Sequence, residues 1–205
     1  MTPRNINEVF RVFRKNYVLV PLEVFGKKPY KSLISTLMSS RTKDEVTLKA
    51  SERLFKKAPN IYKLNKLRTE EIRKLIYPVG FYKTKAKHLK TLAKIIVTDF
   101  NGKIPKDRKN LTALPGVGRK TANLVLNRAL GKPAIAVDTH VHKISNMLGW
   151  VKTKTPEATE KKLNKILPKK HWPEINRLFV SIGQQYKSKK KVQIFLESKG
   201  LLKKR

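Results

Sequence analysis

The sequence has no cysteine, few acidic residues and no long apolar run. The missing thiols exclude disulfides, thiolate zinc sites, cysteine nucleophiles and iron–sulfur clusters held by cysteine. No stretch approaches the roughly 18–20 apolar residues of a membrane span, and the first ten residues lack the apolar core of a signal peptide. We therefore expect no secretion, no membrane partner and no bound cofactor.

The scarcity of acidic residues leaves a large excess of positive charge. The 205 residues include 48 Lys and Arg against 14 Asp and Glu, which gives a formal net charge of +34. Such a charge favours a polyanionic partner, nucleic acid in particular, because many cations can displace counterions from a phosphate backbone. The alternative is a lysine-rich surface that is merely solvated. The length allows one domain or two small ones.

Apolar residues recur at helical spacing along nearly the whole chain, which predicts an all-α fold. Asn101-Gly102 is then a turn between helices, and the strand-like stretch 134–137 is too short and isolated to form a sheet. Helices are predicted over 6–13, 33–38, 69–76, 86–100, 120–130, from Asp138 to Gly149, from Thr155 onward, over 172–186 and over 189–199.

The most informative stretch is LPGVGRKTAN, residues 114–123. Gly116 and Gly118 allow a tight turn with outward-facing backbone N–H groups, and the helix that follows begins with Arg119 and Lys120. A helix start behind such a turn binds a phosphate well. Lys120 is therefore either a phosphate-binding lysine or a nucleophile.

A second informative residue is Asp138, in the sequence VDTH. Its carboxylate can accept a proton and stabilise a cation, and it can also cap the helix that starts near Thr139. His140 and His142 follow it, but a spacing of two does not place side chains on one helix face, so we expect no metal site. We expect a structural role for His140, and surface positions for the isolated His88 and His171.

Six motifs occur in an order that resembles one known family. They are Arg-Thr-x-Asp at 41–44, VGFYKTKA, NGKIP, LPGVGRKTAN, AVDTHV and SIGQQY. Together, over about residues 30–186, they resemble the endonuclease III branch of the helix-hairpin-helix DNA glycosylase superfamily, in a form without the iron–sulfur cluster. The resemblance implies two helical lobes with a DNA-binding cleft between them. One lobe would be 22–132, with the helix-hairpin-helix motif, and the other 1–21 plus 133–205, with the aspartate and a cysteine-free tail.

The resemblance also implies an activity. The protein would be a bifunctional DNA glycosylase and AP lyase of base excision repair, with Lys120 as Schiff-base nucleophile and Asp138 as catalytic carboxylate. Its substrate would be duplex DNA with a damaged base, an oxidised pyrimidine in the first place, or an abasic site. We expect a monomer in the cytoplasm, associated with the nucleoid. The alternatives are a monofunctional thymine or adenine mismatch glycosylase and an inactive DNA-binding module.

Further residues match positions at which the family contacts DNA. Arg41 stands where well-known members carry glutamine at the mouth of the site, and Phe81 stands at the position of an apolar wedge. Arg41 could also be a plain phosphate contact, and Phe81 a core residue. Lys187 takes the place of the first cluster cysteine. The expected DNA-binding set is Arg41, Phe81, Leu114, Gly116, Gly118, Arg119 and His140.

Overall fold

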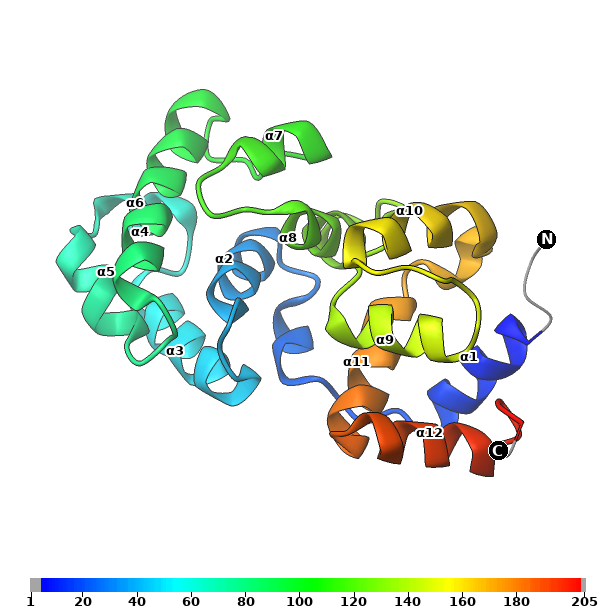
Figure 1. The fold of residues 1–205 in the computed structure, drawn as a ribbon. Helices are drawn as coiled ribbons and strands as arrows, with labels where there is room; N and C mark the ends of the chain where they lie inside the picture. Colours follow the sequence, from blue (N-terminus) through cyan, green and yellow to red (C-terminus); the bar gives the residue numbers. More distant parts are fainter. Residues whose placement is uncertain (1–4, 204–205) are drawn as a thin grey trace. The chain divides into compact units, whose positions relative to one another are not determined.

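The computed structural model describes residues 5–203 (Figure 1). The described residues form helices, turns and loops, with no strand among them, so the all-α prediction is confirmed. The chain divides into two compact units. One is contiguous, Pro21–Lys132, and the other combines the described residues of Met1–Val20 and Pro133–Arg205. No helix in the described part of the chain has the length and apolar character that a membrane span needs.

The contiguous unit is built around α2 and α6. The long helix α6 packs against α4 and α5, whereas α2 packs against α3, α8 and two short helical segments. The elements are η1 (Pro21–Phe25), α2 (Pro29–Ser39), α3 (Asp44–Lys57), α4 (Ile61–Lys66), α5 (Thr69–Ile76), α6 (Tyr82–Asp99), α7 (Arg108–Ala113), α8 (Arg119–Leu124) and η2 (Val125–Ala129).

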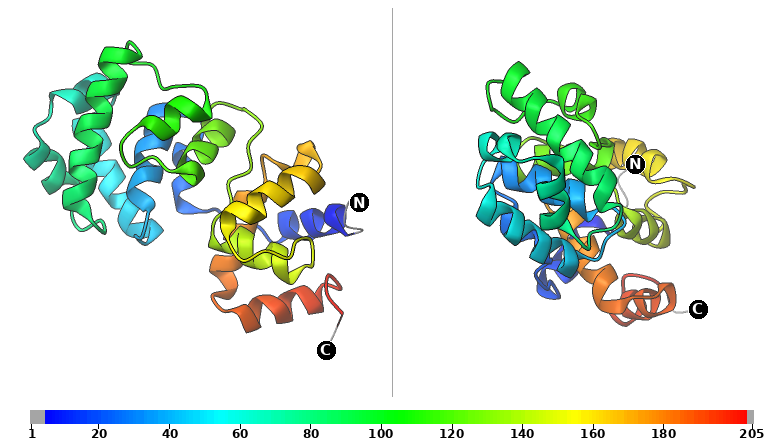
Figure 2. Two further views of the ribbon diagram at one scale, coloured as in Figure 1. Left: turned by 45° about the horizontal axis from the view of Figure 1, so that its top comes forward. Right: turned by 90° about the vertical axis from the view of Figure 1, so that its left-hand side faces the viewer.

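The second unit is assembled from both ends of the chain around α11, which contacts α1, α9 and α12. Its elements are α1 (Ile6–Lys15), α9 (Thr139–Met147), α10 (Pro156–Ile166), η3 (Lys169–His171), α11 (Ile175–Tyr186) and α12 (Lys189–Ser198). Aromatic rings fill the core, where Phe13 lies 5.0 Å from Phe179 and 6.2 Å from Phe195 between ring centroids. The last helix, red in Figure 2, therefore belongs to this core through its apolar face.

Local sequence explains most of the helix boundaries. The buried residues of α1 are Ile6, Val9, Phe10, Val12 and Phe13, one stripe of an amphipathic helix. The start of α5 is fixed by the Glu71 carboxylate, whose Oε2 accepts from the Arg68 N–H at 2.8 Å. Thr155 Oγ1 caps α10 by accepting from Ala158 N–H, with Pro156 at the first helical position.

Two predicted helices differ from the structure. The helix expected over 120–130 changes type after Leu124, and its second half, η2, is a π-helix in which the Leu130 N–H donates to Val125 O at 3.2 Å. The helix expected from Trp172 begins only at Ile175, because the preceding residues form a turn. The stretch Ala134–Val137 is buried and is not a strand.

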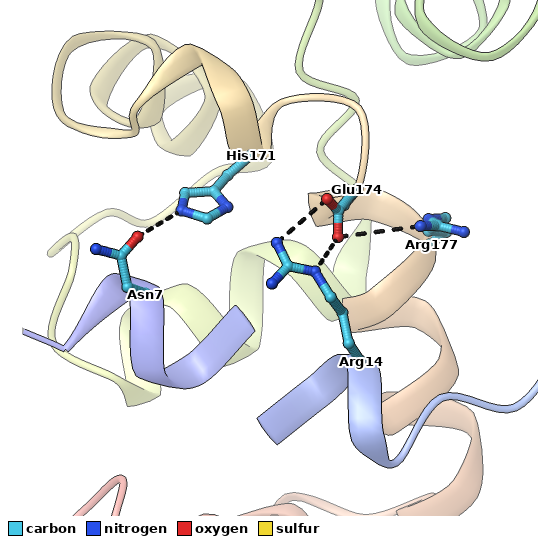
Figure 3. Close-up of polar contacts among 5 residues, drawn as sticks. All are labelled: Asn7, Arg14, His171, Glu174 and Arg177. Carbon is cyan, nitrogen blue, oxygen red and sulfur yellow. Dashed lines mark hydrogen bonds and ion pairs between the residues drawn. The ribbon is translucent and has the colours of Figure 1, made fainter. Parts of the chain in front are cut away.

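The prediction that His171 is a surface residue is wrong. Its side chain is 3% exposed, and its ring stacks on Phe10 with centroids 4.0 Å apart. Nε2 lies 2.9 Å from Asn7 Oδ1, and Nδ1 is buried without a hydrogen-bond partner (Figure 3). Burial is the main cause that lowers the His171 pKa, helped by the nearby charges of Lys170 and Arg14 and opposed by Glu174. In the same cluster, Arg14 forms a bidentate pair with Glu174.

Candidate functional site

The helix-hairpin-helix motif is formed by α7, the turn 114–118 and α8. Gly116 has φ +75°, in the left-handed region that the tight turn requires. A Cβ at this position would lie 2.6 Å from Nδ1 of His88, so His88 packs beneath the hairpin and is only partly exposed. The expectation of a surface His88 is therefore wrong in part.

Leu114 and Gly118 mark the two ends of the hairpin turn. The Leu114 side chain is 3% exposed, and its carbonyl accepts from Val117 N–H at 3.1 Å. Its side chain thus anchors the turn in the unit, and its place in the DNA-binding set stays a prediction. Gly118 is the N-cap residue of α8 and is exposed.

Lys120 lies in the first turn of α8, and its side chain and that of Arg119 are exposed. The helix itself is held firmly, because Arg108 Nε of α7 donates to Oδ1 of the fully buried Asn123 at 2.9 Å. The hairpin therefore presents an amine on an ordered frame, as a nucleophile requires.

Asp138 is the N-cap of α9. Its Oδ1 accepts from His140 N–H at 3.0 Å and from Val141 N–H at 2.9 Å. The capping role considered from the sequence is thus present, and it fixes the carboxylate in orientation. Both bonds use Oδ1, which leaves Oδ2 for chemistry.

The two histidines after Asp138 each pack against a neighbouring helix. His142 Nδ1 lies 2.7 Å from Thr159 Oγ1, which links α9 to α10. The His140 ring lies so close to α11 that a Cβ at Gly183 would be 2.0 Å from its Nδ1. Within residues 5–203, no group of three His, Cys, Asp or Glu side chains could hold a metal ion.

Arg41 and Phe81 lie together at the surface of the contiguous unit. The Arg41 guanidinium carbon is 5.5 Å from the centroid of the Phe81 ring. Phe81 is 60% exposed, which excludes the alternative that it is a core residue. Both residues have left-handed backbones, with φ +52° and +57°, at the end of α2 and the start of α6. Non-glycine residues take this conformation only when the surroundings hold them there.

The structure thus groups the site residues in two places. Lys120, Arg119, the hairpin, Arg41 and Phe81 belong to the unit Pro21–Lys132, whereas Asp138 and His140 belong to the other unit. Sequence reasoning missed Lys85, a buried lysine whose Nζ contacts the end of α2, and Gly183, against which His140 packs. Lys85 is one of many lysines and nothing in its local sequence marks it as buried.

An iron–sulfur cluster of the kind that many members of the resembling family bind does not fit this chain. The sequence has no cysteine, and Lys187 at the first cluster position has φ +53° and ends α11. The following helix starts with three exposed lysines and buries Val192, Phe195 and Leu196 instead. Apolar packing of α12 thus closes this part of the unit.

Comparison with known proteins decides the family. Residues 34–169 match the HhH-GPD superfamily of base excision DNA repair proteins. The chain belongs to this superfamily. Endonuclease III of Thermotoga maritima is 48% identical over 157 residues, which cover 77% of this chain and 74% of that protein. Endonuclease III-like protein 1 of Mus musculus is 44% identical over 159 residues, or 76% of this chain and 53% of the mouse protein.

Solved structures of endonuclease III match the fold of this HhH-GPD protein. A non-covalent Endonuclease III–DNA complex matches with a TM-score of 0.82 and 32% identity, and a trapped covalent Endonuclease III–DNA intermediate matches with 0.79 and 32%. Both alignments cover 92% of this chain and 89% of the other. The predicted membership of the endonuclease III branch is confirmed, and with it DNA as a partner and DNA glycosylase/AP lyase activity in base excision repair.

Proposed function

We propose that this protein removes damaged bases, oxidised pyrimidines among them, from duplex DNA and then cleaves the strand 3′ to the abasic site. The observation that carries the proposal is the exposed Lys120 in the first turn of α8, behind a glycine hairpin, in a chain 48% identical to an endonuclease III. The exposed pair of Arg41 and Phe81 adds side chains suited to enter a duplex from which a base has been extruded.

In the first step we assign Lys120 as the nucleophile. Its neutral amine attacks C1′ of the deoxyribose, the glycosidic bond breaks, and the base leaves with the bonding electrons and takes up a proton. The sugar ring opens to an iminium ion on Nζ. Loss of a C2′ proton then breaks the C3′–O bond and releases the 5′-phosphate end, and water hydrolyses the imine to free Lys120.

Asp138 assists this step as a carboxylate. Its Oδ1 is occupied by the cap bonds to His140 and Val141, and Oδ2 remains to accept a proton or to stabilise positive charge that develops on the sugar. An oriented carboxylate stabilises developing positive charge without having to reorganise. The exposed hairpin residues Gly116, Gly118 and Arg119 hold a neighbouring phosphate in this proposal.

Borohydride trapping tests the assignment of Lys120. Duplex DNA with dihydrouracil or a preformed abasic site is incubated with the protein and reduced, and a covalent adduct is expected for the parent chain and not for Lys120→Gln. The matched control is Lys109→Gln, which removes one positive charge from an exposed lysine of α7 in the same hairpin motif.

The outcome separates the competing functions. Adduct formation by Lys120→Gln at the parent rate would contradict the assignment. Base release by the parent chain without any adduct indicates a monofunctional glycosylase, and binding without base release indicates an inactive module. We also propose that the protein acts as a monomer and associates with the nucleoid, for which sedimentation with and without DNA is the test.

A further inference from the structure

Arg41 and Phe81 come from loops 40 residues apart in sequence, and a small set of hydrogen bonds joins these loops. Thr42 Oγ1 accepts from the Gly80 N–H at 3.0 Å and donates to Ser40 O at 3.2 Å. The approach is so close that a Cβ at Gly80 would lie 2.5 Å from Arg41 O. The backbones next to Arg41 and Phe81 are therefore in direct contact.

Lys85 adds further hydrogen bonds between the two loops. Its Nζ donates to Met38 O at 2.7 Å, to Ser40 O at 2.5 Å and to Thr42 Oγ1 at 3.2 Å. Two of these acceptors are carbonyls at the end of α2, where helical partners run out. Lys85 is on α6, one turn after Phe81, and the Lys85 N–H donates to Phe81 O at 2.9 Å. One residue thus binds both loops.

The energetic cost of burying the Lys85 ammonium indicates that this lysine has a functional role. The Lys85 side chain is 6% exposed, and the three acceptors of its ammonium are neutral oxygens. A buried charge without a carboxylate is expensive, and burial lowers the Lys85 pKa to about 8. An apolar side chain would fill the space at lower cost, but it would leave two helix-end carbonyls and the loop without donors.

We propose that Lys85 is a positioning residue for lesion probing, because its ammonium holds the loops of Arg41 and Phe81 together as one rigid probe. The proposal rests on the proposed function, in which these two side chains enter the duplex. Loss of the ammonium frees the loops to move apart, so that Arg41 and Phe81 no longer act together. Base extrusion is then impaired more than the chemistry at a site that has already lost its base.

Lys85→Met tests the proposal, with Lys90→Met as the matched control. Lys90 lies on the same helix, and its Nζ also donates to a backbone carbonyl, Asn65 O, outside the two probe loops. Both substitutions remove one charge and the contacts of a lysine with backbone carbonyls, two carbonyls for Lys85 and one for Lys90. An effect of the lost charge therefore appears in both variants, whereas an effect on probing appears only in Lys85→Met.

The first readout is the fluorescence of 2-aminopurine placed beside a tetrahydrofuran abasic-site analogue, which rises when the duplex is unstacked. At saturating protein, Lys85→Met should give less than a third of the parent increase, and Lys90→Met the full increase. The second readout is single-turnover rate. Lys85→Met should lose at least tenfold on dihydrouracil DNA and less than threefold on a preformed abasic site.

Two further variants secure the interpretation. Thr42→Val keeps the side-chain volume and removes the oxygen that joins Lys85 to Gly80, so it should show the same split of rates even where Lys85→Met does not fold. Because the chain has no other thiol, Lys85→Cys can be unfolded, alkylated with 2-bromoethylamine and refolded. The thiolate displaces bromide and gives an ammonium of lysine length, which should restore the fluorescence increase.

The outcomes distinguish the two proposals. If the parent chain itself cleaves neither DNA, the proposed function fails. If the parent chain is active but Lys85→Met and Thr42→Val resemble Lys90→Met in both readouts, Lys85 is a structural residue and the inference is wrong. A loss of equal size on both DNAs would also contradict it.

Discussion

Substitution of Gly183 by alanine tests how the second unit places Asp138. Gly183 lies in α11, and a Cβ there would be 2.0 Å from His140 Nδ1 and 2.6 Å from Cγ. Ordinary contacts begin at 3.4 Å, so the ring would have to move by about 1.4 Å. His140 is the second residue of α9 and donates its backbone N–H to Asp138. The displacement therefore reaches the carboxylate.

Two opposing effects set the change in stability caused by Gly183→Ala. Alanine in place of glycine inside a helix stabilises by about 0.8–1 kcal/mol. Overpacking of a filled core costs about 1–3 kcal/mol. We expect Gly183→Ala to be less stable than the parent chain by up to about 2 kcal/mol in urea unfolding, with a reduced single-turnover rate on an abasic site.

A double-mutant cycle isolates the collision. In a His140→Ala background the ring is gone, so Gly183→Ala should stabilise by its helix propensity alone, about 0.8–1 kcal/mol. The coupling free energy between the two sites is then about 1–3 kcal/mol. If Gly183→Ala stabilises the parent chain and leaves its single-turnover rate unchanged, the reasoning is wrong. The His140 ring could then move without affecting Asp138.

Three further predictions concern the tail, the buried histidine and DNA binding. Phe195 is 4% exposed and stacks 4.5 Å from Tyr186, so Phe195→Ala should lower the free energy of unfolding in urea by about 3–5 kcal/mol. Ile194 is 53% exposed on the same helix, and Ile194→Ala should lower it by less than about 0.5 kcal/mol. The folded-state pKa of His171 is lowered, so below about pH 6.5 the unfolded chain binds more protons than the folded chain, and stability should fall as the pH drops through that value towards the folded-state pKa. His171→Phe should flatten this part of a profile of melting temperature against pH. A profile as steep as that of the parent chain would contradict the assignment. Affinity for duplex DNA, measured by anisotropy, should fall with a log–log salt slope of about −0.9 per phosphate contact and should not change in EDTA; a loss on chelation that a divalent ion restores would indicate a metal requirement.

The elements that the sequence predicted well are those with a clear apolar stripe or a local stop signal. Helix α1 has its stripe at Ile6, Val9, Phe10 and Phe13, and Asp138 precedes α9 as a cap. Helix α3 was not recognised because its buried face includes the small polar residues Thr47 and Ser51. Periodicity of apolar residues does not detect such a face.

The site shows the same division between local and tertiary information. The hairpin glycines, Lys120 and Asp138 stand in motifs that are local in sequence. The burial of Lys85 and His171 and the contact of His140 with Gly183 depend on residues more than 40 positions away, or on packing that local sequence does not encode. A charged or polar residue is assigned to the surface by default, and the structure is needed to find the exceptions.

The discontinuous second unit has a consequence for synthesis on the ribosome. Helix α1 is translated well before α11 and α12, whose side chains cover Phe10 and Phe13. At a translation rate of about 5–20 residues per second, Phe179 is synthesised on the order of 10–30 s after the apolar stripe of α1. All helices of the contiguous unit Pro21–Lys132 are translated before α9, α10, α11 and α12. We therefore expect this unit to fold first, while α1 is still an amphipathic segment without its partners.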